Sequence, residues 1–100
     1  MRKIDITPYD ATIIENGVSS IKPYEITLAL INLMFSPELG LSARGFVEQD
    51  GIASKIERSG PELILEDREY KRLYKAVESF RGYNRNDVEL IRRVMNAEKI

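Results

Sequence analysis

The carboxylates that could take part in catalysis or metal binding are gathered in one short segment. This acidic segment contains Glu62, Glu66, Asp67 and Glu69. Carboxylates that converge on a cleft can hold Mg²⁺ or act as acid and base. Negative charge is also stabilising in the first turn of a helix, and a helix is expected to begin at this point. We therefore keep a carboxylate-metal hydrolase only as a remote alternative.

The residue types that most enzymes rely on are absent. The sequence contains no Cys, His or Trp. Without Cys there is no disulfide, thiolate nucleophile or usual structural zinc site. Without His the chain lacks the commonest general base near neutral pH. No glycine-rich phosphate loop is present either. The composition favours a protein that is not an enzyme and uses no cofactor.

A basic segment with one aromatic residue lies near the C-terminus. Residues 68–100 carry nine Lys or Arg against five Asp or Glu. Phosphate binding and base stacking need such side chains, and the candidates here are Arg81, Tyr83, Arg85, Arg92 and Arg93. However, Asp87 and Glu89 interrupt the segment, and the pI is about 5.5. Nucleic-acid binding is therefore the alternative function, and a solvated turn with Tyr83 on the core is favoured.

The element that must organise these groups is a central helix over residues 24–36. Its apolar residues do not alternate, and Pro23 stands where a helix can start. Leu30 and Leu33 lie on its most apolar face, and Asn32 and Ser36 lie on a polar stripe. An adjacent face carries Leu28, Ile31 and Phe35. A helix that is apolar around most of its girdle must be covered on several sides.

Short strands are predicted on the N-terminal side of this helix. Residues 2–7 alternate between apolar and polar side chains, which indicates a strand with one buried face. Asn16-Gly17 separates two β-prone runs, residues 11–15 and 18–21. Because Asn-Gly suits a type I′ turn, these runs predict a hairpin. Residues 62–66 could form a short strand or the lead-in to a helix, because three consecutive apolar residues fit both. We favour a short strand that pairs with the N-terminal sheet.

Three further helices are predicted. Ser42 is the expected N-cap of a helix over 43–58, which could also be two pieces broken at Asp50-Gly51. Asp67 is the expected N-cap of a helix over 68–80, which ends before Gly82. Asn86, with Glu89 three residues on, predicts the start of a helix over 87–96. The predicted core residues of these helices include Phe46, Ile52, Ala53, Ile56, Val88, Ile91, Val94 and Met95, with Val47 at the margin and Leu90 alongside.

Together these elements predict a single α+β domain over residues 1–100. A small N-terminal antiparallel sheet, with its hairpin at Asn16-Gly17, packs on about four helices around the central helix 24–36. The first residues lack the apolar core of a signal peptide, and the central helix is too short to span a bilayer. We therefore expect a cytoplasmic protein that does not bind a membrane.

Both ends of the chain resemble small proteins encoded by tailed phages and bacterial prophages. The matching stretches are MRKIDITPY at the start and GYNRNDVELIRRVMNA near the end. The resemblance implies a viral accessory or morphogenesis protein, with other virion proteins as possible partners. Its location would be the cytoplasm of the bacterial host or the virion. The resemblance supplies no catalytic residues.

The leading functional hypothesis is self-association. A chain of 100 residues has few elements with which to cover the whole girdle of its central helix. If Leu28, Ile31 or Phe35 stays uncovered, a second copy is the expected cover, usually in a two-fold dimer. The sequence therefore predicts a non-enzymatic protein that acts through protein–protein contacts.

Overall fold

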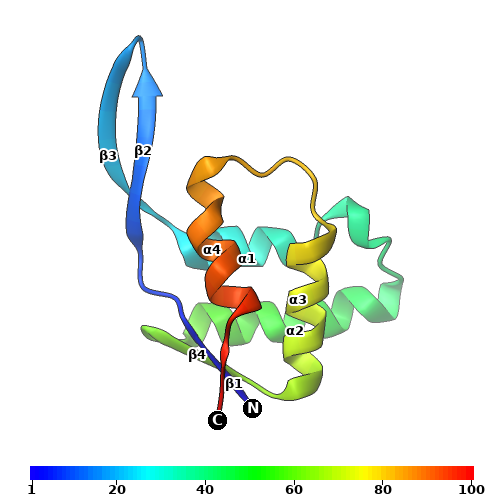
Figure 1. The fold of residues 1–100 in the computed structure, drawn as a ribbon. Helices are drawn as coiled ribbons and strands as arrows, with labels where there is room; N and C mark the ends of the chain where they lie inside the picture. Colours follow the sequence, from blue (N-terminus) through cyan, green and yellow to red (C-terminus); the bar gives the residue numbers. More distant parts are fainter.

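The computed structural model describes all residues 1–100 and has an α+β fold (Figure 1). It confirms the predicted fold class, with an N-terminal hairpin packed on four α-helices. The elements, in chain order, are β1 (Arg2–Asp5), β2 (Tyr9–Glu15), β3 (Val18–Tyr24), α1 (Ile26–Met34), the 3₁₀ helix η1 (Pro37–Leu39), α2 (Ala43–Arg58), β4 (Glu62–Leu65), α3 (Asp67–Ser79), the 3₁₀ helix η2 (Arg85–Asp87), α4 (Val88–Met95) and β5 (Glu98–Lys99).

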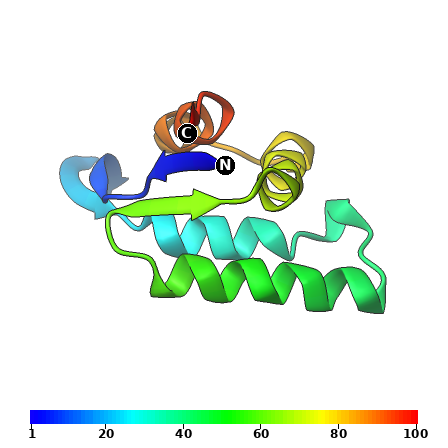
Figure 2. The ribbon, with the colours of Figure 1, turned by 90° about the horizontal axis from the view of Figure 1, so that it is seen from below.

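The helices enclose the core from two sides. Figure 2 shows α1 and α2 side by side along one side of the molecule, with α4 and the two chain ends on the other. The buried side chains of all four helices and of β1 and β4 form one continuous hydrophobic cluster. None of the helices combines the length and the apolar character that a membrane-spanning segment needs.

A three-stranded antiparallel sheet ties the ends of the chain together, in the order β4-β1-β5. Ile4 of β1 stands opposite Leu63 of β4, and both side chains are completely buried. The prediction that residues 62–66 form a strand paired with the N-terminal strand is therefore confirmed, with the strand ending at Leu65. Alternate residues of β4 face the core, which is why Leu63 and Leu65 are buried and Ile64 is not.

The hairpin is a separate two-stranded sheet formed by β2 and β3. Asn16 and Gly17 both have positive φ, 51° and 76°, as a type I′ turn requires. The hairpin is longer than predicted, because pairing continues to Tyr9 opposite Tyr24. Tyr24 therefore belongs to β3, and the prediction that the central helix begins at this residue is wrong. Figure 1 shows the far end of the hairpin extending well beyond the helices.

The central helix occupies residues 26–34 rather than 24–36. Ile26, Leu30, Leu33 and Met34 are buried in the core, in agreement with the predicted face. Asn32 is exposed as predicted, whereas Ser36 is buried. The prediction that Ser36 lies on the polar stripe of the helix is wrong, because the helix ends before this residue. Ser36 instead caps η1, where its Oγ accepts a hydrogen bond from the Glu38 N–H.

The helix α2 is continuous over residues 43–58, so the alternative of two pieces is wrong. Ser42 is its N-cap as predicted, and its Oγ accepts the Gly45 N–H at 3.1 Å. Gln49 of α2 is buried, which its position in the sequence did not predict. Its amide donates to the Met34 carbonyl of α1 at 2.8 Å and accepts from the Arg72 guanidinium of α3 at 2.6 Å. These bonds satisfy a buried amide and join three helices.

The two C-terminal helices begin with different caps from those predicted. Glu66, not Asp67, is the N-cap of α3, and its N–H is accepted by the Glu69 carboxylate at 2.9 Å. Asn84, not Asn86, begins the turn before α4, where the Asp87 carboxylate accepts the Asn84 N–H at 2.8 Å. Both motifs are reciprocal pairs with three-residue spacing. Such a pair was predicted only at Asn86 and Glu89, and the observed one lies two residues earlier.

The buried face of α4 also differs from the prediction. Leu90 and Val94, four residues apart on one face, are completely buried, whereas Val88 and Met95 are exposed. Residue spacing alone allowed two neighbouring faces, and the position of α4 against β1 and α3 selects the one centred on Leu90. Phe46 of α2, which was also expected in the core, is half exposed.

We expect the contrast between Leu30 and Asn32 to test the orientation of α1. Leu30→Ala removes a completely buried side chain and should lower the free energy of unfolding by about 2–5 kcal/mol. Asn32→Ala, on the exposed side, should be nearly neutral or slightly stabilising, because Ala is the better helix former. Chemical denaturation of both variants measures the difference. Equal losses would show that the assigned orientation of α1 is incorrect.

Candidate interaction site

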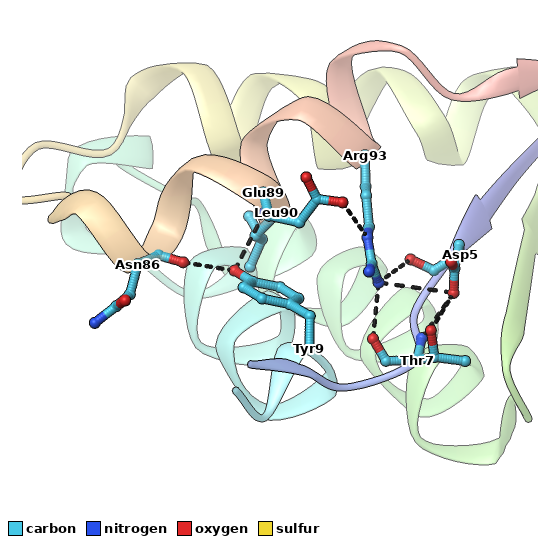
Figure 3. Close-up of polar contacts among 7 residues, drawn as sticks. All are labelled: Asp5, Thr7, Tyr9, Asn86, Glu89, Leu90 and Arg93. Carbon is cyan, nitrogen blue, oxygen red and sulfur yellow. Dashed lines mark hydrogen bonds and ion pairs between the residues drawn. The ribbon is translucent and has the colours of Figure 1, made fainter. Parts of the chain in front are cut away.

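Arg93 of α4 clamps the chain at the base of the hairpin (Figure 3). Its guanidinium donates to the backbone carbonyls of Thr7 at 2.7 Å and Asp5 at 3.2 Å. It also donates to the Glu89 carboxylate at 2.9 Å and lies 5.1 Å from the ring centroid of Tyr9. A single largely buried cation thus fixes the segment between β1 and β2 against α4. Charge-assisted bonds of this kind are stronger than neutral ones.

Two tyrosines complete the attachment of the hairpin. Tyr9 and Tyr24, on opposite strands, stack with ring centroids 4.6 Å apart. The Tyr9 hydroxyl donates to the Asn86 carbonyl at 2.7 Å and accepts the Leu90 N–H at 3.3 Å (Figure 3). The Tyr24 hydroxyl donates to the Asp87 carboxylate at 2.5 Å. Burial, reinforced by this carboxylate, raises the pKa of Tyr24 far above its ordinary value, so the hydroxyl remains a donor.

The side-chain amide of Asn86 binds the backbone of the hairpin rather than one of the hairpin's side chains. Its amide oxygen accepts the Thr12 N–H at 3.1 Å, and its amide nitrogen donates to the Thr12 carbonyl at 2.8 Å. This two-bond contact imitates a neighbouring strand along the outer edge of β2. The hairpin is therefore fixed to η2 and α4 along its first half, which gives it a defined direction. We call this hairpin, residues 9–24, the arm.

Beyond this attachment the arm exposes apolar side chains. Ile14 and Ile21 are 71% and 69% exposed, and Val18 beside the turn is exposed as well. Every residue of β3 from Val18 to Pro23 is exposed. Exposed isoleucines on a two-stranded ribbon add nothing to the core of the chain that carries them. Such side chains are candidates for contact with another molecule.

A second apolar surface, the helix-face patch, lies on the outer side of α1 and α2. Leu28, Ile31 and Phe35 lie along one face of the α1 segment, as predicted from their spacing. Phe46 of α2 joins them, with its ring centroid 5.3 Å from that of Phe35, and Val47 lies beside it. Leu28 is 59% exposed, Phe46 50% and Val47 74%, whereas Ile31 and Phe35 are half-buried. The contribution of α2 was not expected from the sequence, because the spacing of Phe46 predicts a core position.

The structure divides the predicted nucleic-acid residues into two groups. Arg81, Arg85 and Arg92 are exposed. Tyr83 packs edge-on against Phe80, and its hydroxyl donates to the Val77 carbonyl at 2.6 Å. Burial raises the pKa of Tyr83 to about 12. Arg93 is bound in the clamp described above. The predicted stacking residue and one of the four arginines are thus engaged within the chain.

The carboxylates of the acidic segment do not gather into a site. The Glu69 carboxylate accepts hydrogen bonds from the Lys55 ammonium at 2.8 Å and from the Glu66 N–H at 2.9 Å. Burial acts to raise the pKa of Glu69, but these two hydrogen bonds outweigh it and hold the pKa below its ordinary value. Glu62 points from β4, opposite Asp5 of β1. The chain contains no group of three or more acidic side chains that could hold a metal ion.

One cavity of about 350 Å³ opens between α1 and the connection from α3 to α4. Its lining is mainly apolar and includes Leu33, Phe80 and Tyr83. Its one carboxylate, Asp87, already accepts hydrogen bonds from the Tyr24 hydroxyl and the Asn84 N–H. The cavity therefore offers an apolar surface and no free group for acid–base chemistry.

We expect Arg93→Met to loosen the arm while keeping the packing of the arginine stem. The variant loses the charge-assisted bonds to Thr7 and Asp5, which together are worth roughly 1.5–3 kcal/mol. Hydrogen exchange should accelerate at the amides of β2 and β3 and change little in α2. Arg92→Met, an exposed arginine next to it on the same helix, serves as the control. Unchanged exchange in the arm would disprove the clamp.

We also expect the clamp to weaken in acid. Hydrogen bonds from the Thr7 hydroxyl and N–H hold the pKa of Asp5 below its ordinary value, and the nearby Arg93 acts in the same direction. The stabilisation is therefore complete above the unfolded pKa of about 3.9 and is lost as the pH falls through the native pKa. Thermal unfolding should show a smaller acid-induced loss of stability for Asp5→Asn. The Asp10 carboxylate makes no hydrogen bond or ion pair, so Asp10→Asn should keep the full acid-induced loss of stability.

Comparison of the chain with protein-family models, with curated proteins and with solved structures finds no match. The functional assignment therefore depends on the geometry of this chain. That geometry provides two exposed apolar surfaces, the arm and the helix-face patch. Arg93, Asn86 and Asp87 hold the arm in place.

Proposed function

We propose that this chain is a non-enzymatic protein that acts through protein–protein contacts, and that it self-associates through the helix-face patch. The observation that carries the proposal is the exposure of Leu28 on α1 and of Phe46 and Val47 on α2, with Phe46 packed against Phe35. Single exposed apolar residues are ordinary on a protein surface. Adjacent ones that include an aromatic pair are typical of an interface.

A second copy is the occupant that this surface fits best. The patch is formed by two neighbouring helices, and a two-fold axis through it would place apolar residues of both copies against one another. Phe35 and Phe46 form an aromatic pair in the patch, and aromatic residues are enriched among those that carry the binding energy of an interface. Asp50 borders the patch and would remain at the solvated rim.

The biological setting follows from the resemblance of both chain ends to small phage and prophage proteins. A self-associating chain without catalytic groups suits an accessory or morphogenesis role. Other virion proteins would be its further partners, and it would act in the bacterial cytoplasm or in the virion.

Nucleic-acid binding remains the alternative, with less support from the geometry. Arg81, Arg85 and Arg92 are free to contact phosphates, but Tyr83 and Arg93 are engaged within the chain. A carboxylate-metal hydrolase has the least support, because Glu69 is bound by Lys55. No observation on the fold favours either alternative over self-association.

We expect Val47→Asp to weaken self-association without unfolding the chain. The side chain is mostly exposed, so the charge costs little in the monomer but would be desolvated in the interface. Sedimentation velocity over a wide concentration range should show a lower average mass than for the unmodified chain. Val88→Asp makes the same change at an exposed position on α4 and should leave the mass unaltered. An unmodified chain that remains at 11.5 kDa throughout would refute the proposal.

A further inference from the structure

The hydrogen bonds of Thr12 show which residues of the arm have backbone N–H and C=O groups that point away from the neighbouring strand. Both its N–H and its C=O are bound to the side-chain amide of Asn86. Neither group is therefore bound to Ile21, which stands directly opposite Thr12 in β3. Antiparallel strands alternate between hydrogen-bonded and non-hydrogen-bonded pairs. It follows that the backbone groups of Ile21, and of Ser19 two residues before it, point away from β2.

The two edges of the arm are therefore different. The edge of β2 lies toward α4, is bound by Asn86 and carries the charges of Asp10 and Glu15. The edge of β3 lies on the side away from α4 (Figure 1), and the outward groups of Ser19 and Ile21 have no hydrogen-bond partner in the chain.

Proteins usually protect a free strand edge with charges, proline or a covering element. Pro23 protects β3 at its base, where it lacks an outward N–H. From Val18 to Ile21 the strand has neither a charge nor a proline. The edge of β2 is occupied by Asn86 at Thr12 and carries the charges of Asp10 and Glu15, whereas β3 has no such protection from Val18 to Ile21. The edge of β3 is therefore the less protected edge of the arm in the part that extends beyond the helices.

We propose that β3 of a second copy pairs antiparallel with this edge, so that two arms form one four-stranded sheet around a two-fold axis at Ser20. The inference rests on the self-association proposed above, but it uses a surface separate from the helix-face patch. Ser19 of each copy pairs with Ile21 of the other, and each pair exchanges its outward N–H···O=C bonds. Lys22 of one copy then stands opposite Val18 of the other, so the two lysine ammonium groups do not face each other.

The apolar side chains of the arm fit this arrangement. Ile14 and Ile21 project from the same face, because Ile21 pairs with Thr12 and Ile14 lies two residues further along β2. Pairing about Ser20 brings both isoleucines of each copy onto one face of the joined sheet. A two-stranded hairpin is marginal by itself, and a third and fourth strand with an apolar face stabilise it.

The choice of a second copy follows from the protection of β2 and the open edge of β3. A partner strand must be extended, accessible and free of acidic residues facing its counterpart, and β3 itself meets these conditions. Because the edge of β2 is bound by Asn86, pairing through β3 ends at two copies and does not continue into a fibre. Two-fold dimers are the commonest closed assemblies.

Cysteine cross-linking tests the register directly, because the chain contains no cysteine of its own. In the proposed sheet Ser20 faces Ser20 of the second copy as a non-hydrogen-bonded pair, with Cα atoms about 4.5 Å apart. This separation lies within the range that a disulfide spans. Ser19→Cys is the matched control, because two cysteines at that position would be diagonal neighbours roughly 7–8 Å apart. Ser20→Cys should cross-link at least about tenfold faster under mild oxidation.

The cross-linking is carried out in the Val47→Asp chain, so that association through the helix-face patch does not contribute. Faster cross-linking of Ser20→Cys in this background supports pairing of the arms whatever becomes of the patch. Equal rates for the two cysteine variants, or no cross-link from either, would overturn the inference. If the unmodified chain still self-associates in that case, the proposed function stands and only the paired arms are refuted.

A proline substitution provides a second test that does not need a new side-chain contact. Ser19→Pro removes an outward N–H and leaves the hydrogen bonds within the arm intact, as Pro23 does at an equivalent position. In the Val47→Asp chain it should abolish the remaining dimer seen by sedimentation. Ser19→Ala keeps the N–H and should retain the dimer. A dimer that survives Ser19→Pro, or that Ser19→Ala removes equally well, would contradict strand pairing.

Discussion

The contact between Arg93 and the segment that precedes the hairpin is the interaction on which the rest of the architecture depends. A two-stranded ribbon has no core of its own and is marginally stable in water. Here its first residues are held by a largely buried guanidinium that binds two backbone carbonyls, and its tyrosines bind the start of α4. The ribbon acquires a direction from the helices, and the surface it presents is defined rather than fluctuating.

Several polar side chains of this protein join its secondary-structure elements. Gln49 joins α1, α2 and α3 through its amide, and Asn86 joins the arm to the turn before α4. No buried side-chain nitrogen or oxygen lacks a hydrogen-bond partner. Buried polar groups cost free energy unless they are satisfied, and an active site usually contains groups whose capacity is reserved for a substrate. In this chain the buried side-chain polar atoms all have hydrogen-bond partners within the fold.

The two proposed interfaces have different physical character. The helix-face patch relies on burial of side chains, which is strong where aromatic and aliphatic groups interdigitate and has little directional preference. The edge of β3 relies on backbone hydrogen bonds, which fix register and direction. A chain with two separate two-fold contacts can assemble beyond a dimer, into a closed dihedral group or an extended array. Such behaviour suits a component that assembles with its own copies.

Local signals were enough to predict the elements. Asn16-Gly17 required a type I′ turn, the apolar spacing of Ile26, Leu30 and Leu33 required a buried helical face, and Ser42 required a helix start. These depend on backbone preferences and periodicity, which a sequence carries directly. The misplaced cap at Asn86 and the misassigned core residue Phe46 depend instead on long-range contacts. Asn86 is used by Thr12, seventy-four residues away, and Phe46 meets Phe35 across two helices.

The sequence by itself determined the α+β class, the hairpin turn and the principal buried face of the central helix. Only the tertiary structure decided which side of the hairpin is free and which helix shares the exposed face of α1. The reason is that an edge strand or an exposed face is defined by what fails to cover it. That depends on the position of α4 relative to β2, and of α2 relative to α1, and no local spacing encodes these positions. Burial is a property of the assembled chain, whereas turn and helix propensities belong to its residues.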